Sequence, residues 1–142
     1  MKAYLNRRYH FSASHRLQTD AYDAAKNRAL FGKCNNPHGH GHNYTVQITV
    51  SGQVDPATGM VCNLADLDAF AQENLLSRFD HTNLNTLDAF ANRVSTTENL
   101  SIEVYRIFQS FPAAHLERVH IEETSNNSFD YAGLVQPAPG TI

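Results

Sequence analysis

Three of the eight histidines fall in one short run, His38-Gly39-His40-Gly41-His42, and they are the first candidates for chemistry in this sequence. On an extended chain, residues two apart point to the same side, so His40 and His42 can aim two imidazoles at one point. The glycines keep that point free of other side chains. A catalytic zinc ion takes three protein ligands and keeps one position open. The run therefore predicts two ligands of a zinc site and calls for a third.

The third ligand has two candidates. His15 ends a predicted strand over residues 2–15, and in a hairpin the end of this strand meets the start of the next one. That pairing places His15 opposite His40 and His42. His38 has the same parity as these two, but three alternate histidines span roughly 13 Å of strand, too far for one ion unless the strand bends. The spacing favours His15, and a polar surface loop is the alternative for the whole run.

Cys34 precedes the histidines by a short loop and has polar neighbours on its C-terminal side and Gly-Lys before it. Near a divalent cation and imidazoles, its thiol would lose its proton more easily and could act as a base or nucleophile. The alternative is a small buried side chain, which is the commoner fate of a free cysteine. Cys62 fits that alternative, because it lies in an apolar stretch before a predicted helix.

Two further pairs of residues could take part in chemistry. Asp80 stands next to His81, and a carboxylate beside an imidazole can set its tautomer and hold a proton relay. Glu122 and Glu123 lie on a predicted strand, where a carboxylate can bind an amidine-like edge through paired hydrogen bonds. Pairs of this kind are also common on solvated surfaces, so the residues alone leave both interpretations open.

The elements that must position these residues are predicted from the apolar pattern. Alternating apolar side chains indicate four strands, over residues 2–15, 42–51, 116–124 and 128–135. One helix is predicted over 64–78, and a second begins at a capping box of Ser95 and Glu98 and ends before Pro112. Residues 18–41 are polar and irregular, which is typical of a long functional loop. The order predicts an α+β domain, an antiparallel four-stranded sheet with two helices on one face.

Length and composition narrow the class of protein. The 142 residues are 42% hydrophobic and 18% charged, which fits one domain and excludes a disordered chain and a coiled coil. No apolar run approaches the ~18 residues of a membrane helix, and the N-terminus has no secretory h-region. The net charge of −3 gives no reason to expect nucleic-acid binding. We expect one cytoplasmic domain over 1–142, with reduced cysteines and a flexible tail over 136–142.

Six stretches of the chain together resemble the 6-pyruvoyl-tetrahydropterin synthase family, which also contains the carboxytetrahydropterin synthases of the queuosine pathway. The stretches are FSASHRL, CNNPHGHGHNY, VDPATGMVCNLADL, FDHTNLN, VSTTENLS and EETSNN, in order from about residue 11 to 127. The stretch from Cys34 to the histidines and the DPATGM-NLADL stretch are long and specific. One departure is His38, where the closest family motif usually has Asn.

The resemblance implies a role for nine residues. The zinc ligands implied are His15, His40 and His42, the catalytic residues are Cys34, Asp80 and His81, and the substrate-binding residues are Glu123, Thr96 and Thr97. It also implies the tunnelling fold, in which subunit sheets close into a barrel, and a homo-hexamer of two trimers with sites between subunits. An open sheet would leave two edges exposed to aggregation, and pairing of these edges between subunits would prevent it.

The activity implied is that of a zinc-dependent lyase that eliminates triphosphate from 7,8-dihydroneopterin triphosphate and rearranges the side chain to a 6-pyruvoyl group, without a redox cofactor. The five residues between Cys34 and His40 resemble the pyruvoyl-forming group. The alternative is the 6-carboxytetrahydropterin synthase of queuosine biosynthesis. A zinc-binding module without turnover is less favoured, because structural zinc sites are closed and usually contain cysteines. Candidates for contact with the triphosphate are Arg16, Lys26, Arg28 and Lys33.

Overall fold

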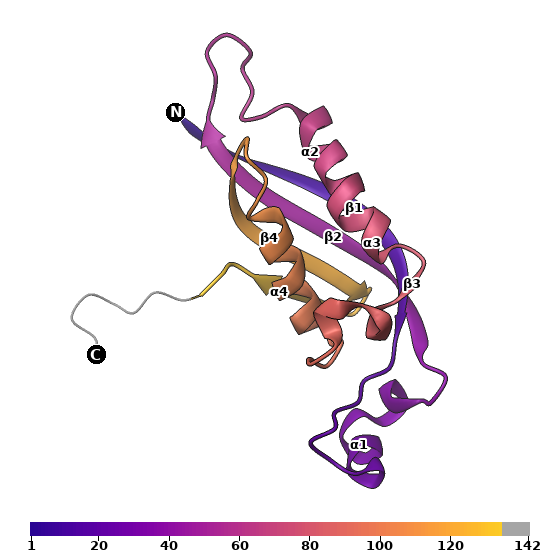
Figure 1. The fold of residues 1–142 in the computed structure, drawn as a ribbon. Helices are drawn as coiled ribbons and strands as arrows, with labels where there is room; N and C mark the ends of the chain where they lie inside the picture. Colours follow the sequence, from indigo (N-terminus) through magenta and orange to yellow (C-terminus); the bar gives the residue numbers. More distant parts are fainter. Residues whose placement is uncertain (135–142) are drawn as a thin grey trace, which may run out of the picture.

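The computed structural model describes residues 1–134, which form one curved sheet with helices on one of its faces (Figure 1). The strand order is β3-β1-β2-β4-β5. The longer strands pair antiparallel and are β1 (Lys2–His15), β2 (His40–Gln53), β4 (His115–Thr124) and β5 (Asn127–Tyr131). The short β3 (Thr82–Asn83) pairs parallel with the end of β1. The predicted α+β class is confirmed.

The expectation of four antiparallel strands is wrong, because β3 makes the sheet five-stranded and mixed. β3 has only two residues, so no alternation of side chains could mark it in the sequence. The four predicted strands are all present among residues 1–134. The last of them ends at Tyr131 rather than Val135, and residue 135 and the expected flexible tail, 136–142, lie outside the described residues.

Both predicted helices cover the same face of the sheet (Figure 1). The first is continuous through α2 (Leu64–Ala71), the π-helical η2 (Gln72–Leu76) and α3 (Ser77–Phe79), and the second is α4 (Thr97–Phe108). The residue that caps α4 is Thr96, whose hydroxyl accepts a hydrogen bond from the backbone N–H of Asn99. The predicted capping box at Ser95 is therefore one residue too early.

The predicted loop between β1 and β2 contains a helix, α1 (Ala24–Phe31), followed by the 3₁₀ helix η1 (Gly32–Asn35). In Figure 1 this segment projects from the end of the sheet that carries His15 and His40. Within α1 only Asn27 is buried. Because the helix has no apolar face, the sequence carried no periodic signal for it. Two further 3₁₀ turns, η3 (Leu84–Thr86) and η4 (Asp88–Phe90), lie between α3 and α4.

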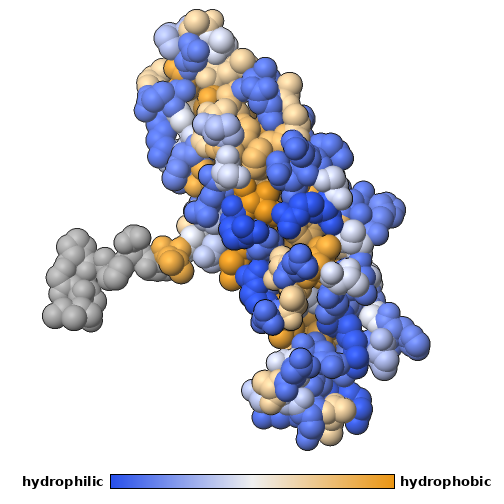
Figure 2. Space-filling model, in the orientation of Figure 1, coloured by the Kyte–Doolittle hydropathy of each residue, from blue (hydrophilic) through white to orange (hydrophobic). Residues whose placement is uncertain are grey.

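The hydrophobic core lies between the sheet and the helices. Figure 2 shows hydrophobic side chains gathered over the region between α2 and α4. Each fully buried Leu, Ile or Phe side chain stabilises the fold by about 1.5–3 kcal/mol. The core therefore holds the strands in place, including the strand ends that carry polar side chains. Its main members are Phe11, Val46, Ile48, Val119 and Ile121 of the sheet and Leu67, Leu75, Phe79, Leu100, Val104 and Phe108 of the helices. None of the helices described within residues 1–134 is long and apolar enough to cross a membrane.

Candidate functional site

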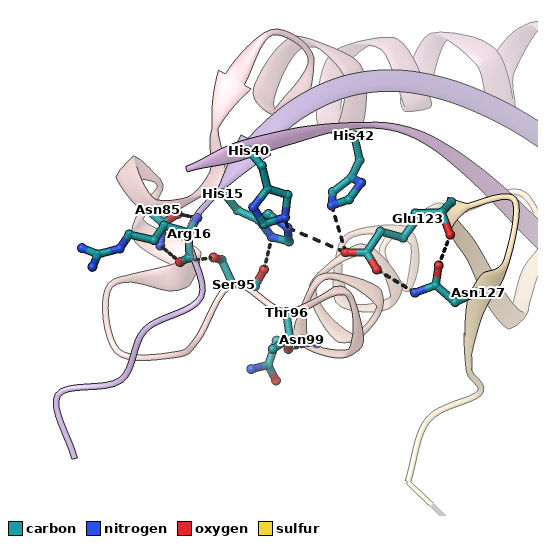
Figure 3. Close-up of polar contacts among 11 residues, drawn as sticks. His15, Arg16, His40, His42, Asn85, Ser95, Thr96, Asn99, Glu123 and Asn127 are labelled. Carbon is teal, nitrogen blue, oxygen red and sulfur yellow. Dashed lines mark hydrogen bonds and ion pairs between the residues drawn. The ribbon is translucent and has the colours of Figure 1, made fainter. Parts of the chain in front are cut away.

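Three imidazoles converge where the end of β1 meets the start of β2 (Figure 3). The register pairs His15 with His40 and Ala13 with His42, so all three histidines face the core side of the sheet. The Nε2 atoms of His15 and His40 are 3.0 Å apart, and one nitrogen from each of the three lies within 4.8 Å of the others. The structure thus brings together the three residues expected to bind a metal. His38 is not part of this cluster and lines an adjacent polar pocket with His15 and Arg16.

The nitrogen atoms of this cluster fit a transition metal. Tetrahedral zinc at about 2.0–2.1 Å from each nitrogen would hold two ligand nitrogens roughly 3.4 Å apart, close to the separation of His15 and His40. Burial lowers the pKa of both of these imidazoles, which keeps them neutral and leaves a lone pair for a metal. The buried Nε2 of His42 has no hydrogen-bond donor or acceptor in good geometry. Metal coordination would satisfy it.

Backbone contacts fix the ring of His15, which is 1% exposed. Its Nδ1 lies 2.6 Å from the carbonyl oxygen of Ser95. Because a carbonyl can only accept, Nδ1 carries the proton and Nε2 presents its lone pair to the cluster. The side chain of Asn85 forms two hydrogen bonds with the backbone of Arg16 and steadies the chain where it leaves β1 (Figure 3). The sequence does not point to Ser95 in this role, because a backbone carbonyl has no residue-type signature.

Glu123 faces the imidazoles from β4 (Figure 3). Its Oε1 lies 3.3 Å from Nε2 of His42 and 3.7 Å from Nε2 of His15, and its Oε2 accepts a hydrogen bond of 2.8 Å from Asn127. The pairing of β4 with β5 is irregular at this point, and such bulges redirect side chains. The adjacent Glu122 is instead exposed, 3.7 Å from His120. The structure therefore separates the two acidic residues that strand alternation alone left open.

Cys34 lies on η1 and lines a pocket with His40 and His42. Its carbonyl accepts a hydrogen bond of 2.8 Å from the backbone N–H of Leu17, which joins η1 to the chain beyond β1. The thiol is half-buried and does not belong to the cluster of metal-ligating atoms. Cys62 packs against the core, where burial raises the pKa of its thiol.

Asp80 and His81 are anchored to Ser12 at the other edge of β1. The Oδ1 atom of Asp80 accepts a hydrogen bond from the Ser12 N–H, and the His81 N–H donates to the Ser12 carbonyl, at 2.9 and 2.6 Å. The side chain of His81 is 84% exposed, and its Nε2 lies 3.7 Å from Asp80. It lines a pocket of about 400 Å³ with His42, and that pocket does not include Cys34.

The remaining predicted residues lie around the start of α4 and in the β1–β2 connection. The hydroxyl of Thr96 is used in capping α4, and Thr97 is 2% exposed. Arg16 donates to the carbonyl of Asn35 and lines the pocket of His38. Lys33 lines the pocket of Cys34. Lys26 lies instead over the ring of Tyr22 on the projecting segment, and Arg28 belongs to α1 of the same segment.

The fold and the site together define an α+β protein with a three-histidine candidate metal centre at paired strand ends and a cysteine beside it. The model of the family described as 6-pyruvoyl tetrahydropterin synthase matches residues 4–133. The chain is 48% identical over 134 residues to the human protein named 6-pyruvoyl tetrahydrobiopterin synthase, covering 93% of this chain and 92% of that protein. It is 46% identical over 135 residues to the Drosophila melanogaster protein of the same name, with 92% and 80% covered.

A solved structure is similar to this chain in both fold and sequence. The Caenorhabditis elegans 6-pyruvoyl tetrahydropterin synthase superposes with a TM-score of 0.90 at 39% identity, over 94% of this chain and 97% of that one. The chain therefore belongs to the 6-pyruvoyl tetrahydropterin synthase family.

Proposed function

We propose that this chain is a zinc-dependent 6-pyruvoyl-tetrahydropterin synthase, a lyase that converts 7,8-dihydroneopterin triphosphate to 6-pyruvoyl-tetrahydropterin and triphosphate. The observation that carries the proposal is the pocket in which Cys34 lies beside two members of the three-histidine cluster. Its family membership and the names of relatives that match more than nine-tenths of its length support the same activity.

The pyruvoyl product is favoured over the carboxy product. The human protein named 6-pyruvoyl tetrahydrobiopterin synthase is 48% identical over 93% of this chain. The Archaeoglobus fulgidus protein named as a putative 6-carboxy-5,6,7,8-tetrahydropterin synthase is 35% identical over 66 residues, which are 46% of this chain. This difference favours the first activity over the queuosine-pathway alternative.

His15, His40 and His42 would hold the zinc ion. Bound zinc supplies a Lewis acid that polarises the hydroxyls of the substrate side chain and makes the neighbouring C–H bonds more acidic. Cys34, as the thiolate, removes a proton from that side chain. Glu123 holds the pterin ring through its carboxylate, and Thr96 and Thr97 line the substrate site near the start of α4.

His81 would return protons to the substrate, with Asp80 setting the orientation of its ring. Because His81 is exposed and lines a pocket without Cys34, we place it in the site of a neighbouring subunit. This arrangement fits a homo-hexamer of two trimers whose sheets close into a barrel. The elimination releases triphosphate, and the hydrogen shifts that follow are internal, so the overall reaction needs no redox cofactor.

Mass spectrometry of the product tests the proposal. The zinc-loaded protein should convert 7,8-dihydroneopterin triphosphate to triphosphate and a 6-pyruvoyl pterin. Acetaldehyde together with a 6-carboxy pterin would instead identify the queuosine-pathway activity. A protein that binds zinc but leaves the substrate intact would be a binding module.

A further inference from the structure

A buried carboxylate lies at the centre of three guanidinium groups on the helical side of the molecule. Glu103 of α4 is 2% exposed. Its Oε2 accepts hydrogen bonds from Nη2 of Arg93 at 3.2 Å and from Nε of Arg106 at 3.1 Å, and its Oε1 accepts from Nη2 of Arg106. Nη2 of Arg78 is 3.9 Å from the same Oε1. Although burial by itself would raise the pKa of this carboxyl, its bonds to Arg106 and the charges of all three arginines hold the pKa below the usual value.

The three arginines come from different parts of the chain, so Glu103 can join those parts to α4. Arg106 lies on α4 itself, three residues from Glu103. Arg78 lies on α3, and Arg93 lies in the segment that leads into α4. Arg93 therefore ties that connecting segment to the helix, whereas Arg106 only joins two residues of one helix.

Arg93 also closes the turn in which it lies. Its Nε donates to the carbonyl of Ala89 at 3.2 Å, and its guanidinium carbon is 5.9 Å from the centre of the Phe90 ring. The remaining Nη2 contact reaches Glu103. One side chain thus joins the backbone of the turn, an aromatic ring beside it and the buried carboxylate of α4.

The segment held in this way carries the backbone partner of the metal cluster. Two residues after Arg93, the carbonyl of Ser95 lies 2.6 Å from Nδ1 of His15. Between them, the carbonyl of Val94 accepts a hydrogen bond of 2.8 Å from the side chain of Asn99, the residue whose N–H is capped by Thr96. The position of the Ser95 carbonyl is therefore set from one side by Arg93 and from the other by Asn99.

We propose that Arg93 and Glu103 are positioning residues of the metal centre. Their ion pair holds the segment from Arg93 to Ser95 so that the Ser95 carbonyl keeps the proton of His15 on Nδ1 and aims Nε2 at the metal. Neither residue contacts the metal ligands, and both act through the backbone. The inference rests on the proposed metal binding by the three histidines.

Arg93→Met and Arg106→Met form a matched pair of variants. Each removes one guanidinium from the same buried carboxylate, and only Arg93 is attached to the segment that carries Ser95. Zinc affinity is measured by competition with a chromophoric chelator, and stability of the metal-free protein by urea unfolding. Loss of a direct partner of a metal-ligating histidine typically weakens binding 10–100-fold, and Arg93 acts one step further out, so we expect about three- to tenfold weaker binding.

Arg106→Met should leave the zinc dissociation constant within about twofold of the wild type, even where it lowers stability as much as Arg93→Met. Arg93→Lys keeps the charge but not the forked geometry and should recover part of the affinity. Nitrogen-15 NMR of the metal-free protein adds a second measurement. The His15 ring should hold its proton on Nδ1 in the wild type and in Arg106→Met, and should divide it between Nδ1 and Nε2 in Arg93→Met.

Each result supports or overturns a distinct statement. If the wild type binds no metal, the proposed metal centre is wrong and the positioning role is wrong with it. If the wild type binds zinc and Arg93→Met binds it equally well, the positioning role is wrong. Equal losses of affinity in both arginine variants, in proportion to their losses of stability, would mean that Glu103 is only a structural ion pair. Should Arg93→Met fail to fold, the same comparison is made with Arg93→Lys and Glu103→Gln.

Discussion

The side chain of His15 and the backbone carbonyl of Ser95 are joined by a contact of 2.6 Å across eighty residues of sequence. The carbonyl fixes which nitrogen of the imidazole carries the proton, and the other nitrogen is left for the cluster with His40 and His42. Because Ser95 lies just before the start of α4, the packing of α4 against the sheet sets the position of this carbonyl. The orientation of the His15 ring at the end of β1 therefore depends on that packing.

The metal ligands can be tested by comparing two histidines of one short run. His40→Ala should abolish stoichiometric zinc binding, because two imidazoles cannot hold the ion as three do. His38→Ala should leave about one zinc per chain, since His38 lies outside the cluster. Metal content after dialysis is measured by atomic absorption. Equal loss from both variants would contradict the assignment.

The role of Cys34 is tested by separating zinc binding from turnover. Cys34→Ala should keep its zinc and its thermal stability, because the thiol lies outside the ligand cluster and is half-buried. Turnover should fall by ~10²–10⁴-fold, the usual contribution of a positioned base. Cys62→Ala is the control and should keep most of its activity. A Cys34→Ala protein that loses its zinc would show that the thiol is a ligand.

Strand parity explains which parts of the site could be predicted from the sequence. Alternation alone places His15, His40 and His42 on one side of a hairpin, and the structure brings them together. Parity could not distinguish the roles of Glu122 and Glu123, because the irregular pairing of β4 with β5 is a property of the folded sheet. The resemblance to relatives made that distinction instead.

Other features had no pattern in the sequence that could reveal them. α1 buries only Asn27 and therefore lacks an apolar face. β3 is two residues long, too short for any periodic signal. The cluster around Glu103 joins residues from two helices and the segment between them through long flexible side chains, and their convergence depends on how α3 and α4 pack.

The ion pairs of Glu103 predict a specific acid sensitivity. Its pKa in the folded protein is held below the ordinary value of 4.5, so the unfolded chain binds the proton more readily. The stability that the carboxylate contributes is therefore fully present above about pH 4.5 and is lost as the pH falls through the folded-state pKa. Urea unfolding of the wild type and Glu103→Gln between pH 7 and pH 3 should give curves that converge at low pH. A constant difference down to pH 3 would contradict the prediction.

His81 has a backbone conformation that residues with a β-carbon rarely adopt. Its φ of 58° lies in the left-handed region, where a β-carbon costs about 1–2 kcal/mol. His81→Gly should therefore be more stable to urea than His81→Ala by about 1 kcal/mol, and His81→Val should be the least stable. All three variants should lose turnover if the imidazole of His81 transfers protons to the substrate. An active His81→Gly enzyme would remove His81 from the mechanism, whatever its stability.

The assignment of His81 and Cys34 to one site made by two subunits can be tested by mixing inactive proteins. Light scattering should first show a hexamer at micromolar concentration, and a monomer would contradict the proposed assembly.

Cys34→Ala and His81→Ala are then unfolded together in equal amounts and refolded with zinc. If each site takes Cys34 from one chain and His81 from another, random assembly gives both native residues to about a quarter of the sites, and activity returns to that level. If both residues act within one chain, every site carries one substitution and the mixture stays inactive. Refolded samples of each variant alone are the controls, and both should remain inactive.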